Sequence, residues 1–404
     1  MVSETVVQTT GVTIDWQHEF DHFSPEYAAD PFPIWDELRE VCPVASSAHI
    51  RNMWVPTRHE DIVAVAHDTT HFSSRSPLVA QFGNMSDFGI TAPPISSDPP
   101  YHTDIRRMLL PFFSPARIEA LRPSVEAYAD ELIDGFIDND GCDAAQDFAQ
   151  FIPVRIIAKM LGIEPADGDQ FRIWVNALLE NAPTNIETAG VNLAQLYGYF
   201  CERIDARRKA PGDDLISFLV SQDVLGRELT DMEIQGMCLL LLLAGIDTTW
   251  SAIGATIWHL AGHPEDQKRL REEPDIWPFA LEEFLRAYAP VTMAREVAVD
   301  HEFKGCPMRQ GEPLLLPFPA ANRDPEVFDR ADEVILDREE NRHLAFGVGI
   351  HRCLGSNLAR LEVRVAVSKF LERVGPFHLA DPSAVRWSTG QIRGPRVLPL
   401  AFDR

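Results

Sequence analysis

The residue with the clearest chemical potential is Cys353, which stands in a loop with Gly347, Gly349 and Gly355. A helix-forming run follows at 357–373. Glycine allows a positive backbone φ and a close approach to a bulky flat group, and a helix N-terminus favours the thiolate form of a nearby cysteine. A thiolate held against a large planar group is what a haem iron needs on its proximal side. The loop therefore contains a candidate haem ligand.

Three other interpretations of this loop compete with haem ligation. A dinucleotide-binding fingerprint would start at Gly347 and Gly349, but the position of its third glycine holds Arg352. A zinc site would need a second cysteine at short spacing, and there is none nearby. A free structural cysteine is a common fate of an isolated cysteine. The loop alone leaves this last interpretation open.

A second candidate site lies in an apolar run, where Asp247 and Thr248 follow the leucine-rich stretch 238–246. Buried acid and hydroxyl groups are costly unless they find partners. In one interpretation Thr248 hydrogen-bonds its own backbone one turn earlier and Asp247 finds a structural cation. In the other, which we favour, the helix opens locally at Gly245 and both side chains handle protons.

A mainly helical chain must position these groups. Thr230 and Glu233 have the spacing of a capping box, which predicts the start of a long central helix ending near Ala261. Its roughly 32 residues would span about 48 Å. Other expected elements are a strand at 53–56, a helix at 58–67, a long loop at 76–100, helices over most of 101–288, short strands at 297–318 and a β-like tail from 377. The result is a mainly α fold with a small β-rich lobe. We expect a flexible segment at 1–20 and a single domain at 21–404.

Composition excludes several classes of partner. The chain has 36 Lys and Arg against 61 Asp and Glu, a net charge of −25, which disfavours nucleic acid or an anionic membrane. We find no signal peptide or membrane anchor at the N-terminus, and the apolar run 237–246 is too short to span a bilayer. Six scattered cysteines without paired spacing fit reduced thiols and a cytoplasmic location.

Two motifs resemble those of the cytochrome P-450 family. The residues Phe346, Gly349, Cys353 and Gly355 match the four fixed positions of its cysteine-ligand loop, and the run 244–249 matches its oxygen-binding motif. The resemblance covers roughly residues 20 to 400 and is to soluble bacterial members. It implies the family fold, with one haem b per chain between the central helix and the Cys353 loop. It also implies that Thr248 hydrogen-bonds dioxygen and that Asp247 connects the site to solvent protons.

The resemblance assigns further residues to the cofactor and its support. It implies that His102, Arg106, Arg295 and His351 contact the haem propionates. It also implies a buried structural cluster in which one carboxylate is shared by two guanidinium groups: Glu283, Arg286 and Arg338. For each cation taken singly, a solvated surface position is the competing interpretation.

The implied activity is a haem-thiolate monooxygenase that inserts one atom of O₂ into a small or medium hydrophobic substrate, by hydroxylation or O-demethylation. Electrons would come from a separate ferredoxin or flavodoxin with its NAD(P)H-dependent reductase. We expect the donor to dock over a basic window at 341–370, where five cations against one acid give a local charge of +4: Arg342, Arg352, Arg360, Arg364 and Lys369 against Glu362. Alternatives are a peroxide-driven peroxygenase, which would lack the acid–alcohol pair, and a non-catalytic haem sensor.

The substrate itself cannot be deduced from these motifs. Candidate pocket residues are mostly apolar and come from the long loop, the central helix, the segment 291–294 and the C-terminal loop: Phe82, Met85, Phe88, Ile90, Leu240, Ala244, Val291, Ala294 and Ile392. Any of them is equally well explained as ordinary core.

Overall fold

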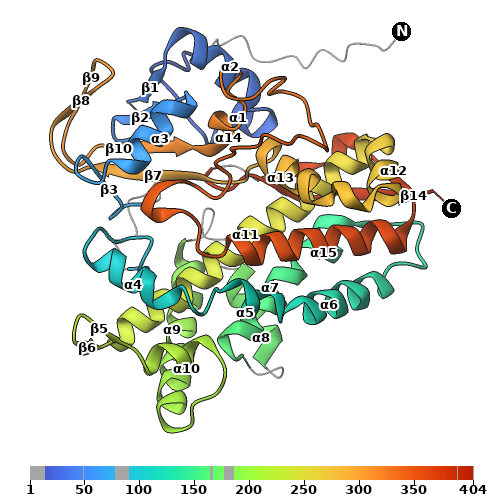
Figure 1. Cartoon of the computed structure of the whole chain (residues 1–404), viewed down its shortest axis with the longest axis horizontal. Coiled ribbons are helices and arrows are strands. Elements are labelled where there is room, and N and C mark those ends of the chain that lie inside the picture. The colour runs from blue at the N-terminus through green and yellow to red at the C-terminus, as the bar shows by residue number, and fades with distance from the viewer. Residues whose placement is uncertain are drawn as a thin grey trace.

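The computed structural model describes residues 14–48, 50–77, 91–163, 167–176, 186–388 and 390–403. Figure 1 shows strands gathered at the upper left, near the N-terminal helices, and helices across the rest of the molecule. This arrangement confirms the mainly α fold with a small β-rich lobe that the sequence predicts.

The helices of the described residues are α1 (Pro25–Ala29), α2 (Phe32–Val41), α3 (His59–His67), α4 (Tyr101–Leu109), α5 (Pro115–Glu119), α6 (Arg122–Asp134), the π-helix η2 (Ala144–Ala149), α7 (Phe151–Leu161), α8 (Gly168–Asn176), α9 (Ile186–Lys209), α10 (Leu215–Val220), α11 (Asp231–Gly262), α12 (Pro264–Glu272), α13 (Trp277–Ala287), α14 (Phe318–Ala321) and α15 (Ser356–Val374). Short 3₁₀ turns are η5 (Pro274–Ile276), η6 (Gly349–His351) and η7 (Pro382–Ala384).

Helix α11 runs through the helical body. The Thr230 hydroxyl accepts the N–H of Glu233, whose carboxylate accepts the N–H of Thr230, so the predicted capping box is confirmed. By length and composition α11 could cross a membrane, yet 72% of its most apolar 18-residue window is buried within the protein. A helix that is apolar on every side is typical of such a buried core position.

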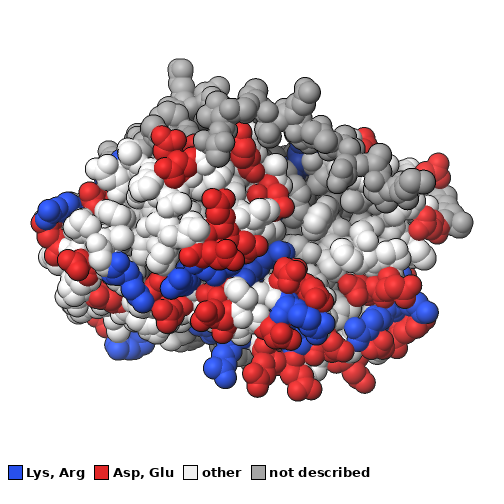
Figure 2. Space-filling view, turned by 90° about the horizontal axis from the view of Figure 1, so that it is seen from above, with Lys and Arg blue, Asp and Glu red and all other residues white. Residues whose placement is uncertain are grey.

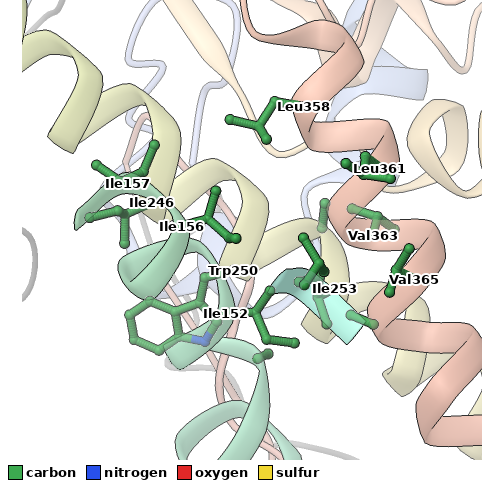
Figure 3. Close-up of a cluster of buried hydrophobic side chains, with 14 of the residues drawn as sticks. Ile152, Ile156, Ile157, Ile246, Trp250, Ile253, Leu358, Leu361, Val363 and Val365 are labelled. Carbon is green, nitrogen blue, oxygen red and sulfur yellow. The ribbon is translucent and has the colours of Figure 1, made fainter. Parts of the chain in front are cut away.

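Helices α7 and α15 cover α11. Figure 3 shows the side chains that interdigitate between the three helices. They are Ile152, Ile156 and Ile157 from α7, Ile246, Trp250 and Ile253 from α11, and Leu358, Leu361, Val363 and Val365 from α15. This packing fixes α11 relative to the segment that contains Cys353, because α15 follows that segment directly.

The β-rich lobe is built on a five-stranded sheet with the order β1-β2-β10-β7-β3. Its strands are β1 (Val44–Ser47), β2 (Met53–Pro56), β3 (Phe72–Ser73), β7 (Thr292–Val297) and β10 (Pro313–Pro317). β10 pairs in parallel with β2 and antiparallel with β7. The other strands are β4 (Gly141–Asp143), β5 (Asp223–Val224), β6 (Arg227–Glu228), β8 (His301–Phe303), β9 (Cys306–Met308), β11 (Phe377–Leu379), β12 (Arg386–Trp387), β13 (Pro395–Val397) and β14 (Pro399–Phe402).

The N-terminal part of the described chain is packed onto this lobe. Phe20 is fully buried against Trp35, with ring centroids 5.1 Å apart. The backbone of Glu19 forms an isolated antiparallel β-bridge with Ser47. Residues 1–13 lie outside the described residues. The flexible segment expected at 1–20 stays a prediction, and its last residue, Phe20, packs onto the lobe.

The hairpin β12–β13 crosses α11 at close range. A Cβ atom on Gly394 would lie 2.3 Å from the Cβ of Ser251, so only glycine allows this approach. The close crossing brings Arg396 of β13 to the middle of α11, beside Ser251 and Trp250.

Candidate functional site

The loop that contains Cys353 is held against the β-rich lobe. The N–H of Cys353 donates to the carbonyl of Phe346 at 2.7 Å, which closes the loop on itself. Gly349 has a φ of +75°, and a Cβ there would lie 2.8 Å from the carbonyl oxygen of Ala66 at the end of α3. Glycine is needed at this position because of its backbone conformation and the proximity of α3.

Cys353 is exposed in the structure, next to the exposed Arg352. Burial of its surroundings raises the pKa of the thiol, while the N–H of Gly355 and the charges of Arg106 and Arg352 act in the opposite direction. A bound metal ion would act in the same direction as these charges and favour the thiolate form.

The four predicted propionate contacts converge near this loop. The rings of His102 and His351 lie 4.1 Å apart between centroids, and Arg106 donates to the carbonyl of Arg352. Burial lowers the pKa of His351 to about 2, with further lowering by Arg295, His102 and Arg106. The positive charges of the other three groups therefore act directly on His351.

None of the four groups forms a salt bridge among the described residues, although the carboxylate of Asp98 acts on His102 and Arg295 from a longer distance. Neither ring nitrogen of the buried His102 has a hydrogen-bond partner, nor has Nε2 of His351, among the described residues. Arg295 is 5% exposed, donates to the carbonyl of Ala294, and has its pKa lowered by burial to about 10. Buried donors without acceptors are rare in folded proteins. An anionic group with two carboxylates, such as haem b, fits this donor set.

On α11, Asp247 is paired with a cation. A guanidinium nitrogen of Arg396 donates to the Asp247 carboxylate, and another donates to Ser251 Oγ at 3.0 Å. The same guanidinium lies 4.3 Å from the ring centroid of Trp250. Sequence reasoning missed Arg396, because it follows Asp247 by 149 residues and belongs to no motif.

Thr248 hydrogen-bonds its own helix. Its Oγ1 donates to the carbonyl of Ala244 at 2.6 Å, and α11 continues without interruption through Gly245. The expected local opening at Gly245 is therefore wrong for this structure, because the hydroxyl satisfies the backbone one turn earlier. With its proton engaged, the hydroxyl oxygen still offers lone pairs to a donor beside α11.

The cluster around Glu283 shows the predicted sharing of one carboxylate. Arg286 contacts both oxygens at 2.8 Å, and Nε of Arg338 lies 3.0 Å from Oε2. The N–H of Ile335 and the amide of Asn341, which sequence reasoning missed, complete the shell at 2.8 and 3.1 Å. Burial alone would raise the pKa of Glu283, but these partners hold it below its usual range.

The structure places the predicted pocket residues in several different environments. Phe82, Met85, Phe88 and Ile90 lie outside the described residues. Leu240 is half-buried and Ala244 is exposed on α11, while Val291 and Ile392 form an isolated β-bridge. Ala294 was a wrong prediction, since it is fully buried with Trp35 in the core of the β-rich lobe.

The predicted basic window has fewer unpaired positive charges in the structure than its sequence suggests. Arg360 makes a two-point contact with Glu282 at 2.6 and 2.7 Å and stacks over Phe346, and Lys369 pairs with Asp130 at 3.2 Å. Three arginines of the window are exposed and form no salt bridge within the described residues, although the charge of Arg364 helps to lower the pKa of Glu119: Arg342, Arg352 and Arg364. Elsewhere acidic groups are abundant, as Figure 2 shows for one face of the molecule.

Comparisons with known proteins agree with this geometry. A profile described as cytochrome P-450 matches residues 155–276 and 278–379. The mycinamicin IV hydroxylase/epoxidase of Micromonospora griseorubida is 35% identical over 383 residues, covering 91% of this chain and 94% of that protein. The vitamin D(3) 25-hydroxylase of Pseudonocardia autotrophica is 32% identical over 400 residues, covering 97% and 98%. The solved structure of PksS, from the bacillaene polyketide synthase of Bacillus subtilis 168, has a TM-score of 0.88 at 31% identity and covers 95% of this chain and 100% of that chain.

The chain belongs to the cytochrome P-450 family. It is a monooxygenase of the bacterial type that binds haem b, so the predicted family, enzyme class and cofactor are confirmed.

Proposed function

We propose that the Cys353 sulfur would bind the haem iron and that Asp247 and Thr248 would handle the protons of the reaction. The observation that supports this assignment is a set of groups beside the Cys353 loop. The ring nitrogens of His102 and Nε2 of His351 have no hydrogen-bond partner among the described residues, and the buried Arg295 donates to a backbone carbonyl. The overall reaction is substrate-H + O₂ + two electrons + two protons → substrate-OH + H₂O. Haem supplies the oxidising chemistry when it is bound.

The chain's own residues orient the cofactor and the protons. His102, Arg106, Arg295 and His351 hold the two carboxylates, and the glycine-rich loop fixes Cys353. Thr248 keeps its proton on the Ala244 carbonyl and presents a hydrogen-bond acceptor. Asp247 exchanges protons with solvent, and Arg396 positions its carboxylate.

The cluster of Glu283, Arg286 and Arg338 is structural. Arg286 also donates to three backbone carbonyls, of Asn322, Ala331 and Glu333, which tie the segment before the Cys353 loop to α13. Because Asn322 in turn accepts the N–H of Leu344 at 2.6 Å, the network reaches the loop itself. We infer that loss of Glu283 prevents haem incorporation.

The substrate we propose is a small or medium hydrophobic molecule, hydroxylated or O-demethylated. Leu240 and Ala244 present an apolar surface on α11, upstream of Thr248. Relatives named for a macrolide, a vitamin and a polyketide widen the set of compounds that merits screening. A shift of the haem Soret band on titration with macrolides, terpenes, phenolic ethers, fatty acids and steroids identifies binders.

We propose further that a ferredoxin or flavodoxin, reduced by an NAD(P)H-dependent reductase, supplies the electrons in the cytoplasm. All six cysteines are free, as expected of a reducing compartment. Product formation that depends on NAD(P)H and the donor, and not on added hydrogen peroxide, supports this route over a peroxygenase.

The decisive experiment changes the ligand. Cys353→Ser should remove the ferrous–CO absorption diagnostic of thiolate ligation, even where some haem remains bound. Cys201→Ser, at another exposed cysteine, is the matched control and should keep the spectrum. A thiolate-type spectrum in Cys353→Ser would reject Cys353 as the ligand.

A further inference from the structure

Two histidines and an aspartate meet at the edge of the β-rich lobe, away from the α11 side chains. They are Asp68, at the C-terminal end of α3, His71, just before β3, and His301, the first residue of β8. One ligand atom from each lies within 4.8 Å of the other two. Figure 1 shows the hairpin β8–β9 as a projection beside β3.

The Asp68 carboxylate is fixed by its own backbone. One oxygen accepts the N–H groups of Thr70 and His71 at 3.0 and 3.1 Å, and the other lies 2.6 Å from Nδ1 of His71. The carbonyl of His71 accepts the N–H of Ala298 at 2.7 Å, which ties this turn to the chain just before β8. The carboxylate and the His71 ring are therefore in place before any ligand binds.

The imidazole of His301 is the third group of this cluster that can bind a metal ion. The ring of His301 stacks on that of His71 with centroids 3.9 Å apart and an angle of 23° between planes. Each imidazole has a nitrogen that can bind a metal ion, so the two stacked rings bring two such atoms close to the Asp68 carboxylate. Side-chain exposures of 33% for His71 and 34% for Asp68 leave the donors accessible to an ion from solvent.

We propose that Asp68, His71 and His301 form a binding site for one divalent transition metal ion, of which Zn²⁺ is the best match. Imidazole nitrogen and carboxylate oxygen are zinc ligands, and three protein ligands with a water complete a tetrahedral shell. Ca²⁺ and Mg²⁺ prefer oxygen ligands alone, so a set with two imidazoles disfavours them.

The location gives the ion a structural effect. Lys304, in the turn between β8 and β9, pairs with Asp61 of α3 at 3.0 Å, so the hairpin already touches α3 near that helix's other end. A metal at Asp68 would join hairpin and helix a second time. The end of α3 also supports the Cys353 loop, since Ala66 lies against Gly349. Bound metal should therefore raise the thermal stability of the haem-loaded protein.

The test uses the haem-loaded full chain without a polyhistidine tag, freed of loose metal by a chelator. Calorimetric titration with Zn²⁺ should show one equivalent whose affinity falls by at least about tenfold in His301→Phe and Asp68→Asn. His301→Phe keeps an aromatic ring for stacking on His71, so folding is preserved while the nitrogens are lost. His71→Ala is expected to abolish that equivalent.

The matched control is His378→Ala. His378 pairs with Asp403 at 2.9 Å, as His71 does with Asp68, and no ring contact with a second histidine is found among the described residues. This variant should retain the equivalent, and Zn²⁺ should still raise its melting temperature. Unchanged stoichiometry and affinity in His301→Phe would overturn the proposal, as would a wild-type protein that binds no Zn²⁺.

Discussion

Arg396 of β13 donates a hydrogen bond to the carboxylate of Asp247 on α11, and the two residues are 149 positions apart in the sequence. Two further contacts of the Arg396 guanidinium, to Ser251 and Trp250, hold it on the helix. The acid proposed to exchange protons with solvent is therefore positioned by the C-terminal hairpin. A residue outside every recognised motif thus becomes part of the site.

Arg396→Gln should slow product formation by about tenfold, less than the ~10²–10⁴-fold typical of an acid–base group itself, because Arg396 only positions the Asp247 carboxylate. Substrate-induced Soret shifts and haem content should stay unchanged, because neither depends on the Asp247 carboxylate. The solvent kinetic isotope effect on turnover should increase, which a merely structural role would not produce. Arg396→Lys should restore part of the rate. Arg386→Gln, on the neighbouring strand β12, is the control and should leave the isotope effect as it is.

Thr248→Val should retain haem and substrate binding but divert reducing equivalents to hydrogen peroxide, lowering product per NAD(P)H by about 10- to 100-fold. Thr248→Ser should keep the coupling because it keeps the hydroxyl.

The control for Thr248 lies on the same helix. Thr256 donates to the carbonyl of Ala252 at 2.8 Å, the same local contact that Thr248 makes with Ala244. Thr256→Val should therefore reproduce any effect of losing that helix contact, without uncoupling. Full coupling in Thr248→Val would contradict the role proposed for its hydroxyl.

Local sequence patterns predicted the parts of the site that depend on short-range geometry. The capping box at Thr230 and the glycine-rich loop at Cys353 were predictable because their determinants lie within a few residues. The sharing of Glu283 by Arg286 and Arg338 spans 55 residues and needed the family resemblance.

Long-range pairing explains what the sequence did not predict. Arg360 was expected to be a free docking charge, but Glu282, 78 residues earlier, neutralises it. Ala294 was expected in the pocket, but successive residues of a strand face opposite sides, and Ala294 faces the Trp35 core. Neither contact leaves a periodic or compositional signal.

Arg295→Met should have different effects on the stability of the haem-free protein and on the retention of haem by the haem-loaded protein. Removing a buried cation that forms no salt bridge among the described residues should leave the haem-free chain equally stable or more stable. Haem retention should fall by about tenfold or more, corresponding to at least ~1.4 kcal/mol, because a carboxylate loses its donor. Transfer of haem to apomyoglobin and thermal melts of both forms measure the two effects. A haem-free chain that melts far lower, with unchanged haem transfer, would assign Arg295 to the fold instead.

The exposed arginines of the basic window should bind the electron-donor protein. Arg342→Glu with Arg364→Glu should lower the rate of donor-dependent haem reduction by about tenfold at low salt, with a smaller difference at high salt. Lys209→Glu with Arg309→Glu changes the net charge equally at exposed positions on other elements. Stopped-flow reduction that slows equally in both double variants would show a general charge effect and reject this docking surface.

Glu362 provides a test of stability against pH. It lies on α15, is fully buried, and neither oxygen has a partner among the described residues. Burial raises its pKa well above the usual range, so the folded state holds a neutral acid that the unfolded chain ionises above about pH 4.3. Below that pH the group is protonated in both states and has no effect. As pH rises from there toward the folded pKa, the stability of the wild type should fall by up to about 1.4 kcal/mol per pH unit.

Glu362→Gln removes this ionisation, so its advantage in melting temperature over the wild type should widen as pH rises from 5 to 8. Glu372→Gln is the matched control on the same helix, since Glu372 is 69% exposed and only 3.9 Å from Lys369. Its melting curve should run parallel to that of the wild type across the same range. If the Glu362→Gln curve is parallel too, Glu362 is ionised in the folded protein and has a partner that offsets its burial.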